Sequence, residues 1–426
     1  MSIVLELSSY QLRLGKGGDH NPSTIYTSHY GMKQRINSPL KRKRTSEYTF
    51  GKCIDFVKSS GDDLLDIRSI YSQNQVRDWS ALESLFEQVL FSDVATKYVS
   101  PSPVLLVEPL RVDRFEQQKM VEILFEKCGV LALSSVKCTS AGVFANGRTS
   151  ALALDMGHSF TSVVPVKDGF TDESKLHRTE LAGAVMTEAS LELLKAEIAR
   201  SKEKDSNFFN SVFGNLRNPS QIKFGAFDVA SRWKEHCCSC HPLPSALQVP
   251  SSSMSSSSSI SSSFTLPDGS QIKSSGNSGD ILSELLFNQS LENLLEATNL
   301  TRHAEFPGNL LKNIPRMESV GKILFQSLTQ FDADTRRNMW ENIVLFGGTS
   351  TAAGMSNRVK RELFPLLPGK AEIKIVQSKI ADRAISSWIG GSIVATTPDF
   401  ASLCLAKSKY EEEGVDRALL LQEIFQ

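Results

Sequence analysis

Short apolar runs and amphipathic stretches alternate along most of the chain. The runs Ile3–Leu5, Val104–Val107 and Val130–Leu133 are typical of buried strands. From Ser80 and from Asp113 onward, apolar residues recur three and four positions apart, which predicts two amphipathic helices. Strands that alternate with helices in this way indicate an α/β architecture.

The same alternation continues through the second half of the chain. Ala151–Leu154 and Phe160–Val166 are apolar segments on either side of the turn Asp155–Ser159, and together they predict a β-hairpin. Ile343–Phe346 is a further predicted strand, and it ends in the tight turn Gly347–Thr349. Helices are predicted over residues 135–144, 184–198, 316–328, 334–341, 355–364 and 388–395.

The composition changes abruptly at residues 251–263, where eleven of thirteen residues are serine. Such a run cannot bury enough apolar surface to offset the entropy of ordering it, which predicts a flexible loop. A strand and turn pattern resumes at once at Phe264–Gly269. The loop is therefore expected inside a domain rather than between two domains.

The charge balance excludes some classes of partner. The chain has 47 Lys and Arg against 47 Asp and Glu in 426 residues, so its formal net charge is zero. Binding driven by a polyanion is not expected, because it depends on an excess of basic residues to neutralise phosphates. Low net charge gives little protection against association, which weakly favours a permanent protein partner. No run reaches the ~18 apolar residues of a membrane span.

The expected compartment follows from the cysteines, the start of the chain and one basic run. Seven cysteines, an odd number, suit a reducing compartment. The opening residues lack the basic lead of a signal peptide. The consecutive residues Lys41, Arg42, Lys43 and Arg44 are either a solvated loop or a nuclear-import signal.

Three turns of small residues are candidate phosphate sites, because each follows a buried strand and its backbone N–H groups can face an anion. The three are Glu6–Ser9, Asp155–Ser159 and Gly347–Thr349. Each turn alone is a weak signal, since such turns are common in α/β proteins. The candidate nucleotide-binding residues in them are Glu6, Ser8, Ser9, Asp155, Gly157, His158, Gly347, Gly348 and Thr349.

The order of these turns resembles that of the actin family. The opening segment IVLELSSYQLRLGKGGD is similar to its first phosphate loop, and residues 151–170, ALALDMGHSFTSVVPVKDGF, resemble its second phosphate hairpin. Residues 342–354, NIVLFGGTSTAAG, resemble its adenosine loop, and WIGGSIVA at 388–395 resembles its C-terminal segment. The resemblance implies an α/β fold of the actin/Hsp70/sugar-kinase-like type, with two similar halves around a nucleotide cleft.

The resemblance also implies four subdomains. The first large subdomain is expected to comprise residues 1–30, 67–148 and 372–426, and the first small one residues 31–66 with a divergent insert. The second large subdomain is expected at residues 149–183 and 312–371. The second small one is expected at residues 184–311, with the serine-rich loop 251–263.

Departures from the family pattern argue against ATP hydrolysis. Glu6 stands where the family has an Asp, and Tyr10 stands where a Gly lets the backbone approach phosphate. His158 replaces the second Asp, which helps order the metal, and Cys138 falls near the Gln that orients the attacking water. Because these groups supply most phosphoryl-transfer catalysis, no catalytic residue and no resident metal are expected. The sequence leaves open whether the chain binds ATP without hydrolysing it.

Further segments resemble the nuclear branch of the family, the actin-related subunits of chromatin-remodelling and histone acetyltransferase complexes. They are Gly157-His158, FANG at 144–147, SRWKEHCCSCHPLPSALQV at 231–249 and KYEEEGVDRALL at 409–420. The resemblance implies a non-catalytic subunit of a SWI/SNF- or RSC-like complex that regulates transcription in the nucleus. A histone acetyltransferase subunit, a cytoskeletal dynactin-type protein and an ATPase or small-molecule kinase are the alternatives. In this nuclear context, import becomes the favoured interpretation of Lys41–Arg44.

The resemblance also implies partners. The chain is expected to pair with actin or another actin-related protein on a helix of the remodelling ATPase, beside other chromatin-complex subunits, with indirect nucleosome contact and no membrane. A groove for apolar anchors of that helix would be lined by Met355, Trp388, Ile389 and Gly390. For Trp388, packing in the core is an equal alternative.

One cysteine-rich cluster invites a zinc interpretation. His236, Cys237, Cys238, Cys240 and His241 are all zinc-ligand types. Their spacing is wrong, because structural zinc sites usually separate paired ligands by two to four residues. Cys238 and Cys240 are therefore interpreted as small buried hydrophobic residues.

Overall fold

The computed structural model describes residues 2–33, 48–51, 65–72, 75–94, 102–201, 218–240, 263–267, 269–273, 278–287, 311, 314–367 and 372–423. The basic run Lys41–Arg44 and residues 251–262 of the serine run lie outside these ranges. The chain divides into two compact units. Unit 1 comprises Met1–Ala153, Val164–Leu176 and Val376–Gln426, and unit 2 comprises Leu154–Val163 and His177–Ile375.

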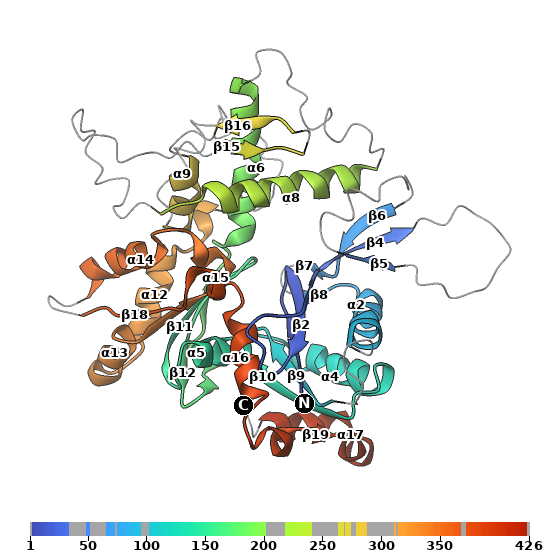
Figure 1. The fold of residues 1–426 in the computed structure, drawn as a ribbon. Coiled ribbons are helices and arrows are strands. Elements are labelled where there is room, and N and C mark those ends of the chain that lie inside the picture. The colour runs from blue at the N-terminus through green and yellow to red at the C-terminus, as the bar shows by residue number, and fades with distance from the viewer. Residues whose placement is uncertain are drawn as a thin grey trace. The chain divides into compact units, whose positions relative to one another are not determined.

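Unit 1 is built on a six-stranded sheet in the order β19-β10-β9-β1-β2-β3 (Figure 1). The neighbours β1, β9 and β10 are parallel, and the other pairs are antiparallel. Every residue of β1 and β9 is buried, as is typical of parallel strands covered on both faces. The strands are β1 (Ile3–Leu7), β2 (Gln11–Lys16), β3 (Thr24–Thr27), β9 (Val104–Glu108), β10 (Ala132–Lys137) and β19 (Leu405–Ala406).

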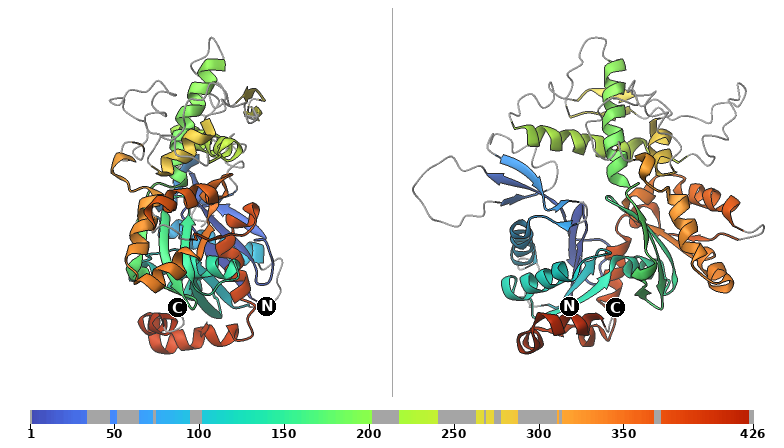
Figure 2. Two further views of the ribbon diagram at one scale, coloured as in Figure 1. Left: turned by 90° about the vertical axis from the view of Figure 1, so that its left-hand side faces the viewer. Right: turned by 180° about the vertical axis from the view of Figure 1, so that it is seen from behind.

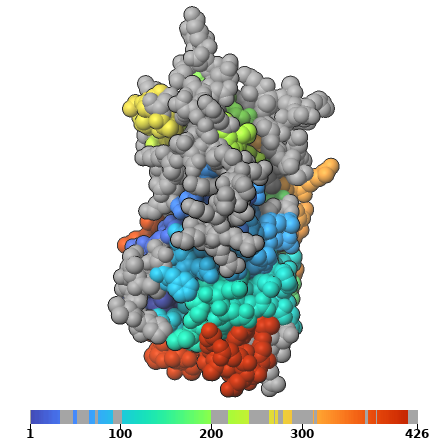
Figure 3. Space-filling view, turned by 90° about the vertical axis from the view of Figure 1, so that its right-hand side faces the viewer, coloured from blue at the N-terminus to red at the C-terminus, as the bar shows by residue number. Residues whose placement is uncertain are grey.

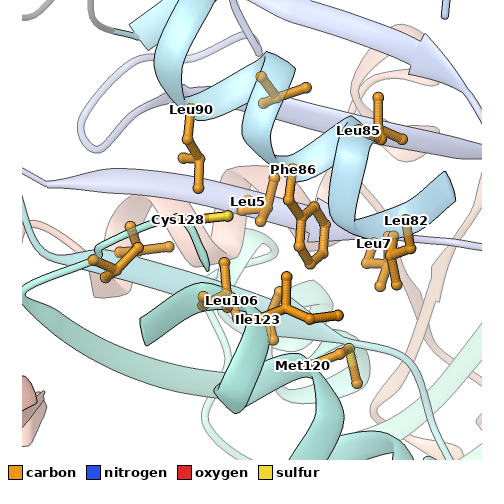
Figure 4. Close-up of a cluster of buried hydrophobic side chains, with 14 of the residues drawn as sticks. Leu5, Leu7, Leu82, Leu85, Phe86, Leu90, Leu106, Met120, Ile123 and Cys128 are labelled. Carbon is orange, nitrogen blue, oxygen red and sulfur yellow. The ribbon is translucent and has the colours of Figure 1, made fainter. Parts of the chain in front are cut away.

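Apolar side chains of unit 1 cover both faces of this sheet. On one face, Leu5 and Leu106 meet Phe86 of α2 (Trp79–Glu87) and Met120 of α4 (Arg114–Glu122), as Figure 4 shows. Asp113 caps α4 by accepting a 2.7 Å hydrogen bond from the Glu116 N–H, which confirms the predicted start of that helix. On the other face, Val4, Leu105 and Val107 pack with Ala141 of α5 (Cys138–Ala145) and Trp388 of α16 (Ser386–Val394).

The prediction of a helix over 135–144 is wrong at its start. Residues Ser135–Lys137 belong to β10, whose pairing with β9 continues to Lys137 opposite Glu108. The ladder to a neighbouring strand holds these residues extended, and α5 begins only at Cys138.

Segments far apart in the sequence meet in unit 1. The Ser2 hydroxyl donates to the Ala395 carbonyl at 2.7 Å, and the Gly18 N–H donates to the Ser392 hydroxyl at 2.8 Å. Elsewhere in unit 1, the Tyr410 hydroxyl of α17 (Lys407–Glu423) donates a hydrogen bond to the Glu126 carboxylate at 2.8 Å. The surface of α17 borders that of α4 in Figure 3. The start of the chain and the segment after residue 380 therefore form one body.

The remaining described elements of unit 1 are short. A three-stranded sheet has the order β5-β4-β6. The elements are β4 (His29–Lys33), β5 (Tyr48–Phe50), β6 (Leu65–Ser69), β7 (Tyr71–Ser72), β8 (Gln75–Val76), η1 (Gln88–Val94), η2 (Ile123–Lys127), η3 (Glu173–Lys175), α15 (Ile380–Arg383) and η9 (Phe400–Leu403).

A second sheet has the order β13-β12-β11-β17-β18, with β14 also paired to β12. The unit boundary passes through β11 and β12, which form the predicted hairpin. The strands are β11 (Ala151–Met156), β12 (Thr161–Lys167), β13 (Phe170–Thr171), β14 (His177–Thr179), β17 (Ile343–Phe346) and β18 (Ile375–Val376).

In unit 2 the helices predicted over 184–198, 334–341 and 355–364 agree closely with the structure. The helix predicted from residue 316 begins only at Val320, and the helix over Pro219–Cys237 was not predicted. The two long helices α6 (Gly183–Ser201) and α8 (Pro219–Cys237) pack across one another (Figure 2). No helix among the described residues combines the length and apolar character needed to cross a membrane. The other elements are β15 (Ser263–Thr265), β16 (Gln271–Lys273), α9 (Ser278–Glu284), η5 (Leu285–Phe287), η6 (Ile314–Arg316), α12 (Val320–Thr329), α13 (Ala333–Trp340), η7 (Gly348–Thr351), α14 (Met355–Leu363) and η8 (Phe364–Leu366).

Candidate functional site

The candidate residues of unit 1 lie in the turn between β1 and β2. Ser8 and Gln11 close this turn around Ser9 and Tyr10, because the Ser8 N–H and hydroxyl both donate to the Gln11 carbonyl, at 3.0 and 2.8 Å. Ser28, which directly follows β3, fixes the turn through its N–H to the Tyr10 carbonyl and its hydroxyl to the Ser9 carbonyl. The donors of Ser8 are therefore used within the turn itself.

Glu6 forms an ion pair that the sequence reasoning missed. Its carboxylate accepts a 2.8 Å hydrogen bond from Arg13, which lies opposite it on the antiparallel strand β2. The side chains of Glu6 and Arg13 are only 6% and 13% exposed. A Glu and an Arg seven residues apart, at matching positions around a two-residue turn, were the signal available in the sequence.

A second ion-pair network lies at the ends of β9 and β10. The Lys137 ammonium is 3.1 Å from the Glu108 carboxylate and 3.6 Å from the Glu173 carboxylate. Burial disfavours the charged form of Lys137, but the two carboxylates outweigh it and raise the pKa of the ammonium above its ordinary value. Lys137 is therefore charged at neutral pH. Cys138, the next residue, begins α5.

The candidate residues of unit 2 come together from three segments. The Gly157 carbonyl accepts hydrogen bonds from the Thr349 hydroxyl at 2.8 Å and from the Gly183 N–H at 3.1 Å. The His158 carbonyl accepts one from the Ala184 N–H at 2.7 Å. These bonds join the hairpin turn to η7 and to the first residues of α6.

Only glycine fits at position 347. Gly347 has a φ of 93°, and an added Cβ would lie 2.5 Å from both the Asp155 carboxylate and the Met156 carbonyl. The backbone of the Gly347–Thr349 turn thus lies directly against the hairpin turn. The structure therefore brings Asp155, Gly157 and His158 together with Gly347 and Thr349.

Lys234 is a further residue of this part of unit 2. Its ammonium donates to the Thr187 hydroxyl at 2.9 Å and to the Gly183 carbonyl at 3.2 Å. Burial takes the Lys234 ammonium out of water and lowers its pKa. Its two hydrogen-bond acceptors are neutral oxygens, which stabilise the charge less than a carboxylate would. No helix was predicted over residues 219–237, and a lysine in the last turn of α8 gives no sequence signal for this position.

The residues proposed to line a partner-helix groove are mostly in the core. Met355 is fully buried in unit 2, with its sulfur 3.7 Å from that of Cys240. Trp388 is fully buried in unit 1 and packs on Gly15, where an added Cβ would lie 2.5 Å from the ring. Gly390 faces the Ala141 carbonyl of α5. Met355, Trp388 and Gly390 therefore contribute to packing within the units. For Trp388, this agrees with the core-packing alternative rather than with the groove.

Ile389 is half-buried and stays a candidate for partner contact. One turn further along α16, Ile393 is 46% exposed. Phe170 of β13 is 51% exposed, and β13 and α16 both contact α5 within unit 1. Sequence reasoning missed Ile393 and Phe170, because a single apolar residue does not reveal whether it is covered.

The described cysteines of the zinc-like cluster are protonated thiols. Burial raises the pKa of Cys237 and of Cys240 to about 12, and raises that of Cys238 well above its ordinary value. Cys240 is buried, whereas Cys238 is half-buried and contacts the Gly279 carbonyl at 3.9 Å. The described part of the chain holds no group of three or more His, Cys, Asp or Glu suited to a metal ion. His241 lies outside it.

Comparisons with known proteins agree on one family across the chain. The family model described as "Actin" matches residues 1–420. The chain is 25% identical to "Actin-related protein 4" of Arabidopsis thaliana, over 97% of this chain and 96% of that protein. It is 26% identical to "SWI/SNF and RSC complexes subunit arp42" of Schizosaccharomyces pombe, over 99% of this chain and 98% of that protein. The chain therefore belongs to the actin family and has the α/β fold of that family.

Proposed function

We propose that this protein is a non-catalytic actin-related subunit of a chromatin-remodelling complex of the SWI/SNF or RSC type, acting in the nucleus to regulate transcription. The observation that carries the proposal is similarity along nearly the whole chain to the fission yeast protein named as a subunit of those complexes. The similarity to Actin-related protein 4 of two plants supports the same branch. Affinity purification followed by mass spectrometry should recover a remodelling ATPase together with actin or another actin-related protein.

The composition of the purified complex separates the proposal from its alternatives. Recovery of an acetyltransferase without a remodelling ATPase would favour a histone acetyltransferase subunit of the same branch. Recovery of dynactin subunits would contradict the proposal and favour a cytoskeletal protein. We also propose that Lys41–Arg44 are the nuclear-import signal and that the protein contacts the nucleosome only indirectly.

The half-buried Ile389 and the exposed Ile393 of α16 support a helical partner. Ile389 and Ile393 lie one turn apart on the same helix, so their side chains project from one face. An amphipathic helix of the remodelling ATPase can cover such residues with its own apolar face. We call Ile389 and Ile393 the α16 surface.

Replacing Ile393 by glutamate is expected to weaken binding of the ATPase helix by about 2 kcal/mol, or about 30-fold in Kd. The reason is that the variant places a charge where apolar contact is needed, while the exposed position leaves the fold intact. Isothermal titration with the isolated helix and the full chain measures the effect.

Leu131→Glu is the matched control, because Leu131 is 51% exposed in the same unit but lies before β10 rather than on α16. Equal weakening by both variants, or by neither, would contradict a role for the α16 surface.

The non-catalytic part of the proposal predicts no ATP hydrolysis above that of buffer in a single-turnover assay run beside actin. Glu6 is held by Arg13, and His158 stands at the position of the family's second Asp. Neither arrangement offers a free carboxylate pair for a metal and its waters. A rate equal to that of actin would overturn this part of the proposal and favour the enzyme alternative.

A further inference from the structure

Three neighbouring parallel strands of unit 1 end at the same edge. The register pairs Glu6 of β1 with Val107 of β9, and Glu108 of β9 with Lys137 of β10. We call the edge where these strands end the carboxyl edge. Ligands of open α/β sheets bind at this edge, because loops and backbone N–H groups gather beyond the strand ends.

The charged side chains of the carboxyl edge pair with one another. Its described ion pairs join three carboxylates, Glu6, Glu108 and Glu173, to two cations, Arg13 and Lys137. Three negative and two positive charges leave these residues with a net charge of −1. The second guanidinium nitrogen of Arg13 donates to the Gln11 side chain at 3.2 Å. Both cations therefore already have acceptors within the chain.

Phosphate binding needs positive charge and hydrogen-bond donors that other acceptors do not hold. Releasing Arg13 to a phosphate would leave the Glu6 carboxylate, 6% exposed, without its partner. Releasing Lys137 would do the same to Glu108, which is 5% exposed. The Nε–H of Arg13 is buried without an acceptor, but one donor beside the Glu6 carboxylate does not make a phosphate site.

We infer that two internal ion-pair groups, Glu6–Arg13 and Glu108–Lys137–Glu173, close the carboxyl edge to nucleotide phosphates. The residues present at this edge do not fit the phosphate groups of the ATP that the actin family implies. The chain then gains no affinity from the triphosphate or from magnesium. This inference concerns the phosphates alone and is independent of complex membership.

Equilibrium dialysis of the purified chain against radiolabelled adenosine and, separately, against ATP with magnesium tests the inference. We expect the two dissociation constants to agree within about threefold, or neither ligand to bind at millimolar concentration. Binding of magnesium-ATP at least tenfold tighter than adenosine would overturn the inference.

Glu6→Gln tests the cause. The substitution keeps the size of the side chain, raises the net charge of the edge from −1 to 0 and frees the Arg13 guanidinium. The variant should bind magnesium-pyrophosphate at least tenfold more tightly than the unchanged chain. Glu122→Gln is the control, because it removes a surface ion pair with Lys119 from the same unit. A folded Glu6→Gln variant with unchanged pyrophosphate binding would refute the role of the ion pair. The comparison of adenosine with magnesium-ATP uses the unchanged chain, so it tests the inference even if the Glu6→Gln variant does not fold.

Discussion

Replacing Arg358 by methionine should destabilise unit 2 by about 3–5 kcal/mol, because it leaves buried carboxylates without their cation. The Arg358 side chain is fully buried and donates twice to Glu284, at 3.0 and 2.8 Å. It also bonds Glu362, and its guanidinium lies 4.2 Å from the centre of the Phe287 ring. Methionine preserves much of the volume, so the lost charge dominates the effect.

Chemical denaturation of the full chain, followed by tryptophan fluorescence, measures the effect of Arg358→Met. Arg361→Met is the control on the same helix, because Arg361 is exposed and the substitution is identical. Combining Arg358→Met with Glu284→Gln and Glu362→Gln should restore part of the stability, since no buried charge is then left unpaired. A loss below about 1 kcal/mol for Arg358→Met alone would show that the network contributes little.

Replacing Gly390 by alanine should also destabilise the protein, by about 3 kcal/mol or more, the upper end of the overpacking range. An added Cβ would lie 1.7 Å from the Ala141 carbonyl oxygen and 2.3 Å from its carbon. These are backbone atoms of α5, so α5 and α16 would have to move apart. On an uncrowded helix the same change stabilises by about 1 kcal/mol, so the sign of the effect is informative.

The unfolding midpoint of Gly390→Ala should be compared with that of Gly348→Ala. An added Cβ at Gly348 meets nothing within 4 Å, and its φ is not positive, so that variant should keep its stability. A stabilised Gly390→Ala variant would mean that α5 and α16 are not in contact at this position.

Local patterns in the sequence predicted the strands β1, β9 and β17, the hairpin of β11 and β12 and many of the helices, because each depends on turn chemistry and apolar spacing within a few residues. The strands β2 to β6 and the helices α8 and α17 were not predicted. The start of α5 was predicted wrongly because Ser135–Lys137 are held extended by β9, a strand about thirty residues earlier. The burial of Trp388 was left open because Gly15, on which it packs, is remote in sequence. Pairing across strands also hid the ion pair between Lys137 and Glu108.

The resemblance of three turns to the actin family identified Asp155, Gly157, His158, Gly347 and Thr349, and the structure joins them through Gly157 and His158. The resemblance gave no information on how carboxylates and cations pair at the carboxyl edge. That depends on which side chains face one another after the sheet has formed.

The bonds from Ser2 to Ala395 and from Gly18 to Ser392 have a consequence for synthesis of the protein. Ser2 and Ala395 are 393 residues apart, so a ribosome makes nearly the whole chain before β1 meets the helix that covers it. On the α16 face, the apolar side chains of Val4, Leu105 and Val107 stay uncovered for that time. Contacts of such long sequence separation slow folding and expose the nascent chain to aggregation. We therefore expect the newly made protein to depend on chaperones until its last helices have emerged.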